Sequence, residues 1–218
     1  MSKYDVVLFD LDGTLTDPGE GITNSVAYAL AKFGIKAERS ELYKFIGPPL
    51  ITSFMEHYNL SQEDGVRAVA YYREYYTPKG IFENKLYDGI PEMLDSLKKS
   101  GKKIVLATSK PENYALQILE HFGIMKYFDG CCGNTMDDAR HLKADVIAYA
   151  REQFPEITEE NTVMVGDRRH DVEGAAVFKI PTVGVTFGYG GREELEAAGA
   201  KRIVDSAAEL ENIIQNWE

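Results

Sequence analysis

Five short, uninterrupted apolar runs constrain the fold of this chain more than any other feature of its sequence. Each run is bounded by turn residues and shows no alternation of apolar and polar positions, which is typical of strands covered on both faces in a parallel sheet. Helical patterns, such as those over 111–123 and 143–154, lie between most of the runs. This alternation predicts an α/β fold with a doubly wound, Rossmann-like parallel sheet. The runs are VVLF (6–9), IVLA (104–107), TVMV (162–165), TVGV (182–185) and RIV (202–204).

Residues 18–82 interrupt this alternation, because they contain helical patterns and no convincing strand. We therefore expect an all-helical domain over 18–82, inserted into an α/β core domain formed by 1–17 and 83–218. A cluster of tyrosines near the end of this insertion has the spacing of helix-packing aromatic residues rather than of a ligand site. The helical patterns cover 21–34, 40–47, 50–58 and 62–76, and the tyrosines are residues 71, 72, 75 and 76.

The charge of the chain argues against several classes of partner. Its 218 residues include 24 Lys and Arg against 35 Asp and Glu, a formal net charge of −11. An acidic chain without a basic run is not expected to bind nucleic acid or an anionic membrane surface. A phosphate-bearing substrate would then need a local positive site, which a divalent cation can supply.

The cellular compartment follows from two further observations. No apolar stretch approaches the ~20 residues of a membrane helix, and Asp10 and Asp12 interrupt the apolar run nearest the N-terminus. Cys131 and Cys132 are adjacent, a spacing that rarely allows a disulfide between them. We expect buried or half-buried free thiols and a cytoplasmic protein.

Polar side chains follow three of the predicted strands, where each strand ends. Because the carboxyl ends of parallel strands meet at one edge of a sheet, we expect these side chains to converge. The set combines carboxylates, hydroxyl groups and a lysine, which suits a phosphoryl group and a hard cation. Its members are Asp10 and Asp12, then Thr108, Ser109 and Lys110, then Asp167 and Asp171.

A magnesium ion explains why two carboxylates stand together at the mouth of a buried strand. Like charges repel and resist desolvation, and a bound cation offsets both effects. Asp10 and Asp167 are the expected direct ligands, and Asp171 lies one helical turn beyond Asp167. An EF-hand calcium loop starting at Asp10 is not indicated, because it would need Gly and Glu where this chain has Leu15 and Gly21.

Four segments, in order, resemble the four motifs of the haloacid dehalogenase superfamily. They are DLDGTLTD (10–17), VLATSKP (105–111), RHLKADVIAYA with its lysine Lys143 (140–150), and VMVGDRRHDVEGA (163–175). The resemblance spans essentially the whole chain, and the helical insertion is similar to the small helical cap of that family.

This resemblance implies a role for each matching residue. Asp10 is the nucleophile that forms an aspartyl-phosphate, and Asp12 is the general acid and then the general base. The implied phosphate-binding residues are Gly13, Thr108, Ser109 and Lys143. The implied Mg²⁺ site uses Asp10, Asp167 and Asp171 together with Asp12, which contributes its backbone carbonyl.

Three other residues or segments are not expected to take part in catalysis. Lys110 competes with Lys143 for the motif lysine, but it leads into Pro111, and we expect it at the rim of the site. His170 is interpreted as a surface residue. The glycine-rich segment 184–195 lacks the Gly-Lys-Ser/Thr ending of a P-loop and is predicted to form a loop near the rim.

The reaction and substrate follow from finer resemblances. Asp12 occupies a position where dehalogenases of this superfamily lack an aspartate, and Thr14 resembles phosphatases more than sugar phosphomutases. The segments FIGPPL (45–50) and GVTFGYG (184–190) resemble phosphoglycolate phosphatases. We expect a monomeric or homodimeric phosphomonoester hydrolase acting on a small phosphorylated metabolite. Alternatives are a 5'-nucleotidase, a pyrophosphatase, a phosphatase of another small phosphoester, a β-phosphoglucomutase-like phosphotransferase and a non-catalytic binding protein.

Overall fold

The computed structural model describes residues 3–217, which divide into two compact units. The α/β unit runs up to Thr16 and resumes at Leu86, and the helical unit comprises Asp17–Lys85. The insertion expected over 18–82 lies inside this observed range. The chain passes between the units in two short strands, β2 (Thr16–Asp17) and β3 (Lys85–Leu86), which pair with each other.

The α/β unit is built on a six-stranded sheet in the order β5-β4-β1-β6-β7-β8, and its paired strands are all parallel. This confirms the predicted fold class. The first strand of the chain is central, between β4 and β6, so the strand order reverses around it. The strands are β1 (Val6–Phe9), β4 (Lys103–Pro111), β5 (Gly130–Asn134), β6 (Thr162–Gly166), β7 (Thr182–Val185) and β8 (Arg202–Val204).

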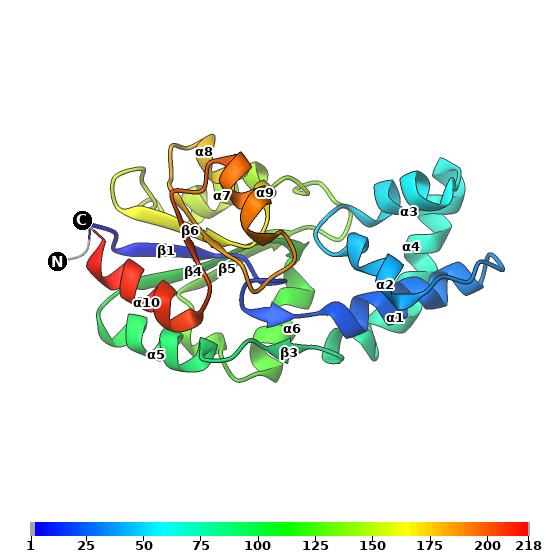
Figure 1. Ribbon diagram of the computed structural model, residues 1–218, viewed down its shortest axis with the longest axis horizontal. Coiled ribbons are helices and arrows are strands. Elements are labelled where there is room, and N and C mark those ends of the chain that lie inside the picture. The colour runs from blue at the N-terminus through cyan, green and yellow to red at the C-terminus, as the bar shows by residue number, and fades with distance from the viewer. Residues whose placement is uncertain (1–2, 218) are drawn as a thin grey trace. The chain divides into compact units, whose positions relative to one another are not determined.

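Helices cover both faces of this sheet (Figure 1). One face carries α7 (Lys143–Gln153), α8 (Arg169–Ala176) and α9 (Gly191–Ala198), and the other carries α5 (Ile90–Lys99), α6 (Glu112–His121) and α10 (Ala207–Asn216). A short 3₁₀ helix, η3 (Met125–Tyr127), follows α6. Val146, Ile147 and Ala150 of α7 are buried in one core cluster with Val6 and Leu8 of β1, as their spacing predicts.

Strand β5 was not among the five predicted strands. Its sequence, Gly-Cys-Cys-Gly-Asn, has low β propensity and two glycines. Both glycines are required by close packing, because a side chain at Gly130 would collide with the ring of Phe154 and one at Gly133 with Glu112. The two cysteines of this strand are free thiols, one half-buried and one buried, as expected. Burial raises the pKa of each to about 12, so neither is a ready nucleophile.

The helical unit contains helices and no strand between Gly19 and Phe82. Ser61 caps α4 by accepting a hydrogen bond from the Asp64 N–H at 3.1 Å. Tyr72 and Tyr76 are buried in this unit, and the ring of Tyr75 packs against that of Tyr28 from another helix, with the ring centroids 5.7 Å apart, as expected of aromatic residues that pack helices. The elements are α1 (Gly19–Ala31), α2 (Arg39–Leu42), η1 (Tyr43–Phe45), α3 (Leu50–Tyr58), α4 (Gln62–Tyr76) and η2 (Gly80–Phe82).

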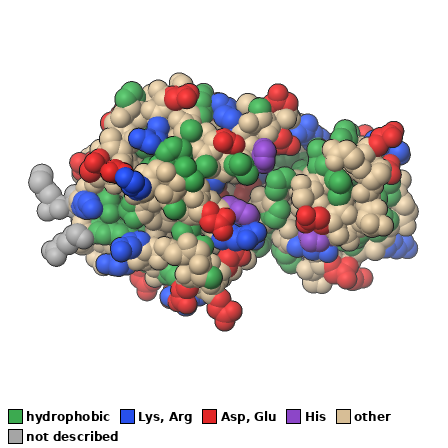
Figure 2. All heavy atoms as spheres, turned by 90° about the horizontal axis from the view of Figure 1, so that it is seen from above, with side chains coloured by type: hydrophobic (Ala, Val, Ile, Leu, Met, Phe, Trp, Pro, Cys, Tyr) green, Lys and Arg blue, Asp and Glu red, His purple; other side chains and the backbone are tan. Residues whose placement is uncertain are grey.

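The surface mixes charges of both signs. On the face drawn in Figure 2, Lys and Arg side chains are interspersed with Asp and Glu over each unit. Within residues 3–217, no helix is both long enough and apolar enough to span a bilayer.

Candidate active site

The site is organised around the carboxyl end of the central strand. Asp10 directly follows β1, and its N–H donates to the carbonyl of Val165 in β6 at 2.9 Å. Its carboxylate therefore stands where the strand order reverses, which is the place where open α/β sheets bind ligands.

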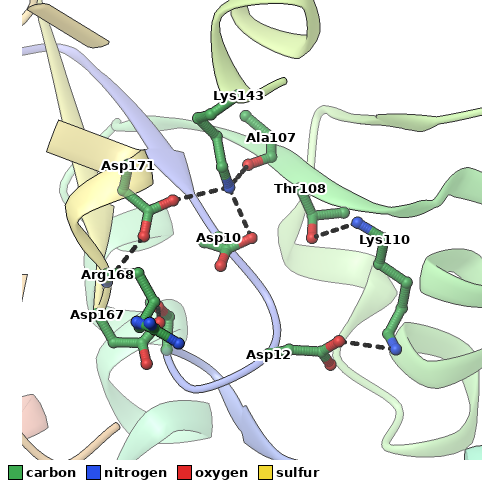
Figure 3. Close-up of polar contacts among 10 residues, drawn as sticks. Asp10, Asp12, Ala107, Thr108, Lys110, Lys143, Asp167, Arg168 and Asp171 are labelled. Atoms are coloured by element: carbon green, nitrogen blue, oxygen red, sulfur yellow. Dashed lines mark hydrogen bonds and ion pairs between the residues drawn. The ribbon is translucent and has the colours of Figure 1, made fainter. Parts of the chain in front are cut away.

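Lys143, the first residue of α7, is the central cation of the site. Its Nζ lies 2.8 Å from Asp10 Oδ1 and 2.8 Å from Asp171 Oδ1, and it donates to the carbonyl oxygen of Ala107 at 2.9 Å (Figure 3). Burial lowers the pKa of this ammonium group, but the two carboxylates outweigh burial and hold its pKa above the usual value. Lys143 is thus a fixed positive charge beside Asp10, where the motif predicts it.

Asp10, Asp167 and Asp171 form a compact cluster of three carboxylates. One oxygen from each lies within 4.8 Å of the others, and all three residues are buried. Burial and the neighbouring acids raise the pKa of Asp167 well above its usual value, and burial raises that of Asp171 to about 6. Three carboxylates and one ammonium leave a net charge of −2 when all are ionised, which one divalent cation neutralises. The donor set suits a hard cation.

Backbone and hydroxyl donors hold two of these carboxylates in place. Asp167 Oδ2 accepts a hydrogen bond from the Tyr189 N–H at 2.7 Å, and Asp167 Oδ1 lies 3.5 Å from the Thr14 hydroxyl, which donates to it. Asp171 Oδ2 accepts from the Arg168 N–H at 3.1 Å, as an acid at the third position of a helix does. Tyr189 belongs to the segment predicted as a rim loop, and this contact places its backbone in the site.

Two glycines make room for the carboxylate of Asp167. Gly13 has a φ of +87°, in the left-handed region, and a Cβ there would collide with the Asp167 carboxylate. A Cβ at Gly188 would meet the same carboxylate and the carbonyl of Gly13. The N–H of Gly13, expected to bind phosphate, donates instead to the Thr16 carbonyl at 2.7 Å. In this structure the absence of a side chain at Gly13 leaves room for the Asp167 carboxylate.

The expectation that Lys110 lies at the rim is wrong. Its side chain is only 7% exposed, and its Nζ lies 2.7 Å from Oδ2 of Asp12, which is 16% exposed. The Asp12 side chain points to this lysine rather than into the carboxylate cluster (Figure 3). Burial raises the pKa of Asp12 more than Lys110 lowers it, so the net shift is upward.

The remaining predicted residues lie on β4 and α8. Thr108 is buried, and its Oγ1 accepts from the Lys110 N–H at 3.3 Å, which leaves its own proton free to donate. Ser109 is half-buried beside it. His170 is half-buried and lies outside the carboxylate cluster. Burial and the adjacent Arg169 lower its pKa.

This arrangement combines a carboxylate at the end of a central strand, a neighbouring cation, a second carboxylate paired with its own lysine and a carboxylate cluster that suits a divalent cation. Those are the parts that phosphoryl transfer requires, since positioning and charge neutralisation dominate its catalysis. The sequence did not single out the contacts of Tyr189, Gly188 and the Ala107 carbonyl. Two of these act through backbone atoms, which carry no side-chain signal, and Gly188 could have been noticed only as one glycine among several in 184–191.

Comparison with known proteins agrees with this geometry. The model of the haloacid dehalogenase-like hydrolase family matches residues 7–185 of the chain. The protein belongs to this family.

Several of the similar proteins are named phosphatases, and others are named a 5'-nucleotidase or a tyrosine-protein kinase. The crystal structure of a predicted phosphatase from Clostridium acetobutylicum superposes with a TM-score of 0.94 at 52% identity, covering 98% of this chain and 99% of that one. A 5'-nucleotidase of Pseudomonas aeruginosa is 38% identical over 98% of this chain and 97% of its own length. The tyrosine-protein kinase PtkA of Mycobacterium tuberculosis is 38% identical over 95% of this chain and 70% of its own. A phosphoglycolate phosphatase of Vibrio parahaemolyticus is 26% identical over 98% of each chain. This chain is a phosphatase of the family.

Proposed function

We propose that the protein hydrolyses small phosphomonoesters through a phosphoryl-enzyme formed on Asp10, with Mg²⁺ as its cofactor. The observation that carries the proposal is the position of Asp10 at the end of β1, where its carboxylate contacts the Lys143 ammonium group and clusters with the carboxylates of Asp167 and Asp171. A buried carboxylate in that setting can be both a nucleophile and a metal ligand.

The reaction divides into two half-reactions. In the first, an oxygen of Asp10 attacks phosphorus while the bond from phosphorus to the leaving oxygen breaks, and Asp12 gives its proton to that oxygen. In the second, Asp12 takes a proton from water as the water oxygen attacks phosphorus. The bond to Asp10 then breaks, which releases phosphate and restores both carboxyl groups. Lys143 balances charge on Asp10 throughout, and the Thr108 hydroxyl is placed to donate to a phosphoryl oxygen.

The metal site fits Mg²⁺ by its chemistry. Its side-chain donors are all carboxylate oxygens, and the net charge of −2 on the cluster with Lys143 matches one divalent cation. We propose that Asp10, Asp167 and Asp171 hold the ion, with the backbone carbonyl of Asp12. When bound, the ion neutralises charge on the phosphoryl oxygens.

The substrate class rests on relatives and on two sequence segments. The resemblance of 45–50 and 184–190 points to phosphoglycolate, whereas the relative at 38% identity is named a 5'-nucleotidase. We propose nucleoside 5'-monophosphates first and phosphoglycolate second, with pyrophosphate as the next candidate. The acidic net charge favours these small molecules over nucleic acid as partners.

A hydrolysis assay on p-nitrophenyl phosphate, with Mg²⁺ and then with excess EDTA, tests the proposal. Turnover should require the metal and vanish in Asp10→Asn, which also controls for contaminating phosphatases. A panel of the proposed substrates, compared by kcat/KM, then identifies the preferred one. Metal-independent turnover, or activity retained in Asp10→Asn, would refute the proposed mechanism.

A further inference from the structure

The ion pair between Lys110 and Asp12 has no part in the mechanism described so far. The pair joins β4 to the loop after β1, with Nζ 2.7 Å from Oδ2, and both side chains are largely buried. The other oxygen, Oδ1, is also buried, and it has no hydrogen-bond partner among the described residues. The two oxygens of this carboxyl group therefore differ: one is held by a lysine, and one is free.

Local backbone structure explains why Lys110 reaches Asp12. Lys110 lies two residues beyond Thr108 on β4, and its N–H donates to the Thr108 hydroxyl oxygen at 3.3 Å. The pairing of β4 with β5 shifts register between Thr108 and Pro111, and such irregularities redirect side chains next to active sites. Pro111 also keeps the preceding residue extended. These features direct a buried lysine toward Asp12.

We propose that Lys110 is a positioning residue for the general acid–base, and this rests on the proposed function. Lys110 holds Oδ2 of Asp12, so that Oδ1 is the atom that carries the proton. In the first half-reaction the proton passes from Oδ1 to the leaving oxygen, and the resulting carboxylate stays paired with the Lys110 ammonium group. In the second, Oδ1 receives a proton from the attacking water. Lys110 itself neither gains nor loses a proton.

A lysine that only stabilised the fold would behave differently from one that acts through Asp12. Its loss would slow the hydrolysis of every substrate alike. Loss of a residue that positions the general acid should matter most when the leaving group is poor, because a poor leaving oxygen needs the proton in the transition state. A lysine that recognised a charge on the substrate would show no such dependence when the leaving groups are uncharged.

The test is a leaving-group series with the variants Lys110→Met and Lys110→Arg. The substrates are p-nitrophenyl phosphate, phenyl phosphate and ethyl phosphate, whose leaving groups carry no charge. Lys102→Met is the matched control, since Lys102 is also a buried lysine, with its side chain 8% exposed, and it donates to the Tyr4 carbonyl away from the site. Circular dichroism establishes that each variant is folded.

We expect Lys110→Met to lose at least about tenfold more kcat/KM on phenyl and ethyl phosphate than on p-nitrophenyl phosphate. On p-nitrophenyl phosphate the variant should release a burst of p-nitrophenol and then turn over slowly, because breakdown of the phosphoryl-enzyme also needs Asp12. Lys110→Arg should keep the leaving-group pattern of the wild type, and so should Lys102→Met. In an Asp12→Asn background, Lys110→Met should add little further loss.

Three results would overturn this role for Lys110. Equal losses on the three substrates by Lys110→Met would make the lysine structural. If Lys110→Met lowers kcat/KM as much in the Asp12→Asn background as in the wild type, Lys110 does not act through Asp12. If Lys102→Met shows the same leaving-group dependence, that dependence is not specific to Lys110. Absence of turnover in the wild type would refute the proposed function and this inference with it. If this inference alone fails, the wild type is active and one of the three contrary results appears in the variants.

Discussion

The stability of the metal-free protein should fall between pH 5 and pH 7.5, and Mg²⁺ should reverse the fall. Asp171 has a pKa of about 6 in the folded state, raised by burial from 3.8. A raised folded-state pKa contributes stability that is present below the unfolded value and is lost as pH rises through the folded one. Asp167, whose pKa is also raised, acts in the same direction.

The size of the effect follows from the shift. A displacement of about two pKa units is worth about 3 kcal/mol in total, of which about 1 kcal/mol is lost between pH 5 and pH 7.5. For a chain of this length, 1 kcal/mol corresponds to roughly 2–4 °C in Tm. Carboxyl groups with lowered pKa, such as Asp129 and Glu83, are largely ionised in both the folded and unfolded states across this range. His170, whose pKa is lowered, gains stability as pH rises through this range and opposes the effect, so the comparison with Asp171→Asn isolates the contribution of Asp171.

Thermal melts at the two pH values, in EDTA and in Mg²⁺, measure both parts of this prediction. In EDTA the wild type should melt at a lower temperature at pH 7.5 than at pH 5, and Asp171→Asn should reduce that difference, while Asp167 retains its own contribution. The ion binds the ionised carboxylates, so its stabilisation should be larger at pH 7.5. A pH difference that persists unchanged in Asp171→Asn, or equal stabilisation by Mg²⁺ at both pH values, would contradict this reasoning.

Three further predictions address single residues of the site. Asp10→Asn should abolish turnover while retaining the wild-type circular dichroism spectrum, since it removes the nucleophile but not its volume; residual turnover above that of a mock preparation would contradict the role. Lys143→Met should reduce kcat by about 10²–10³, because a charge at the reacting group is lost, and a change confined to KM would argue against that. Gly13→Ala should lower the free energy of unfolding by about 2–5 kcal/mol, because it adds left-handed backbone strain and a collision with Asp167. Gly34 has a φ of +71° and open space around it, so Gly34→Ala is the control that should show the backbone strain alone.

The fold was predictable where sequence and packing carry the same signal. A central parallel strand is buried on both faces, so its buried stretch is a continuous apolar run. Such runs predicted β1, β4, β6 and β7 from the sequence. Strand β5 does not, because packing against Phe154 and Glu112 demands glycine at two of its five positions. Tertiary packing overrides strand propensity there, and nothing in the local sequence records it.

The acidic residues of the site were predictable for a topological reason. The carboxyl ends of parallel strands must meet, so acids that follow β1 and β6 are brought together regardless of their separation in the chain. The partner of Asp12 was not predictable in the same way. The direction of the Lys110 side chain depends on a register shift between β4 and β5, and β5 was itself missing from the prediction.

The chain uses two means to hold acids that repel one another. Lys143 offsets part of the charge on Asp10 and Asp171, while Asp167 has no lysine within ion-pair distance among the described residues and relies on the Tyr189 N–H and the Thr14 hydroxyl. Neutral donors stabilise a carboxylate less than a cation does, which is consistent with the raised pKa of Asp167. Asp167 is therefore the acid with the most to gain from a bound cation. A second lysine there would relieve the repulsion but would compete with the ion for the same oxygens.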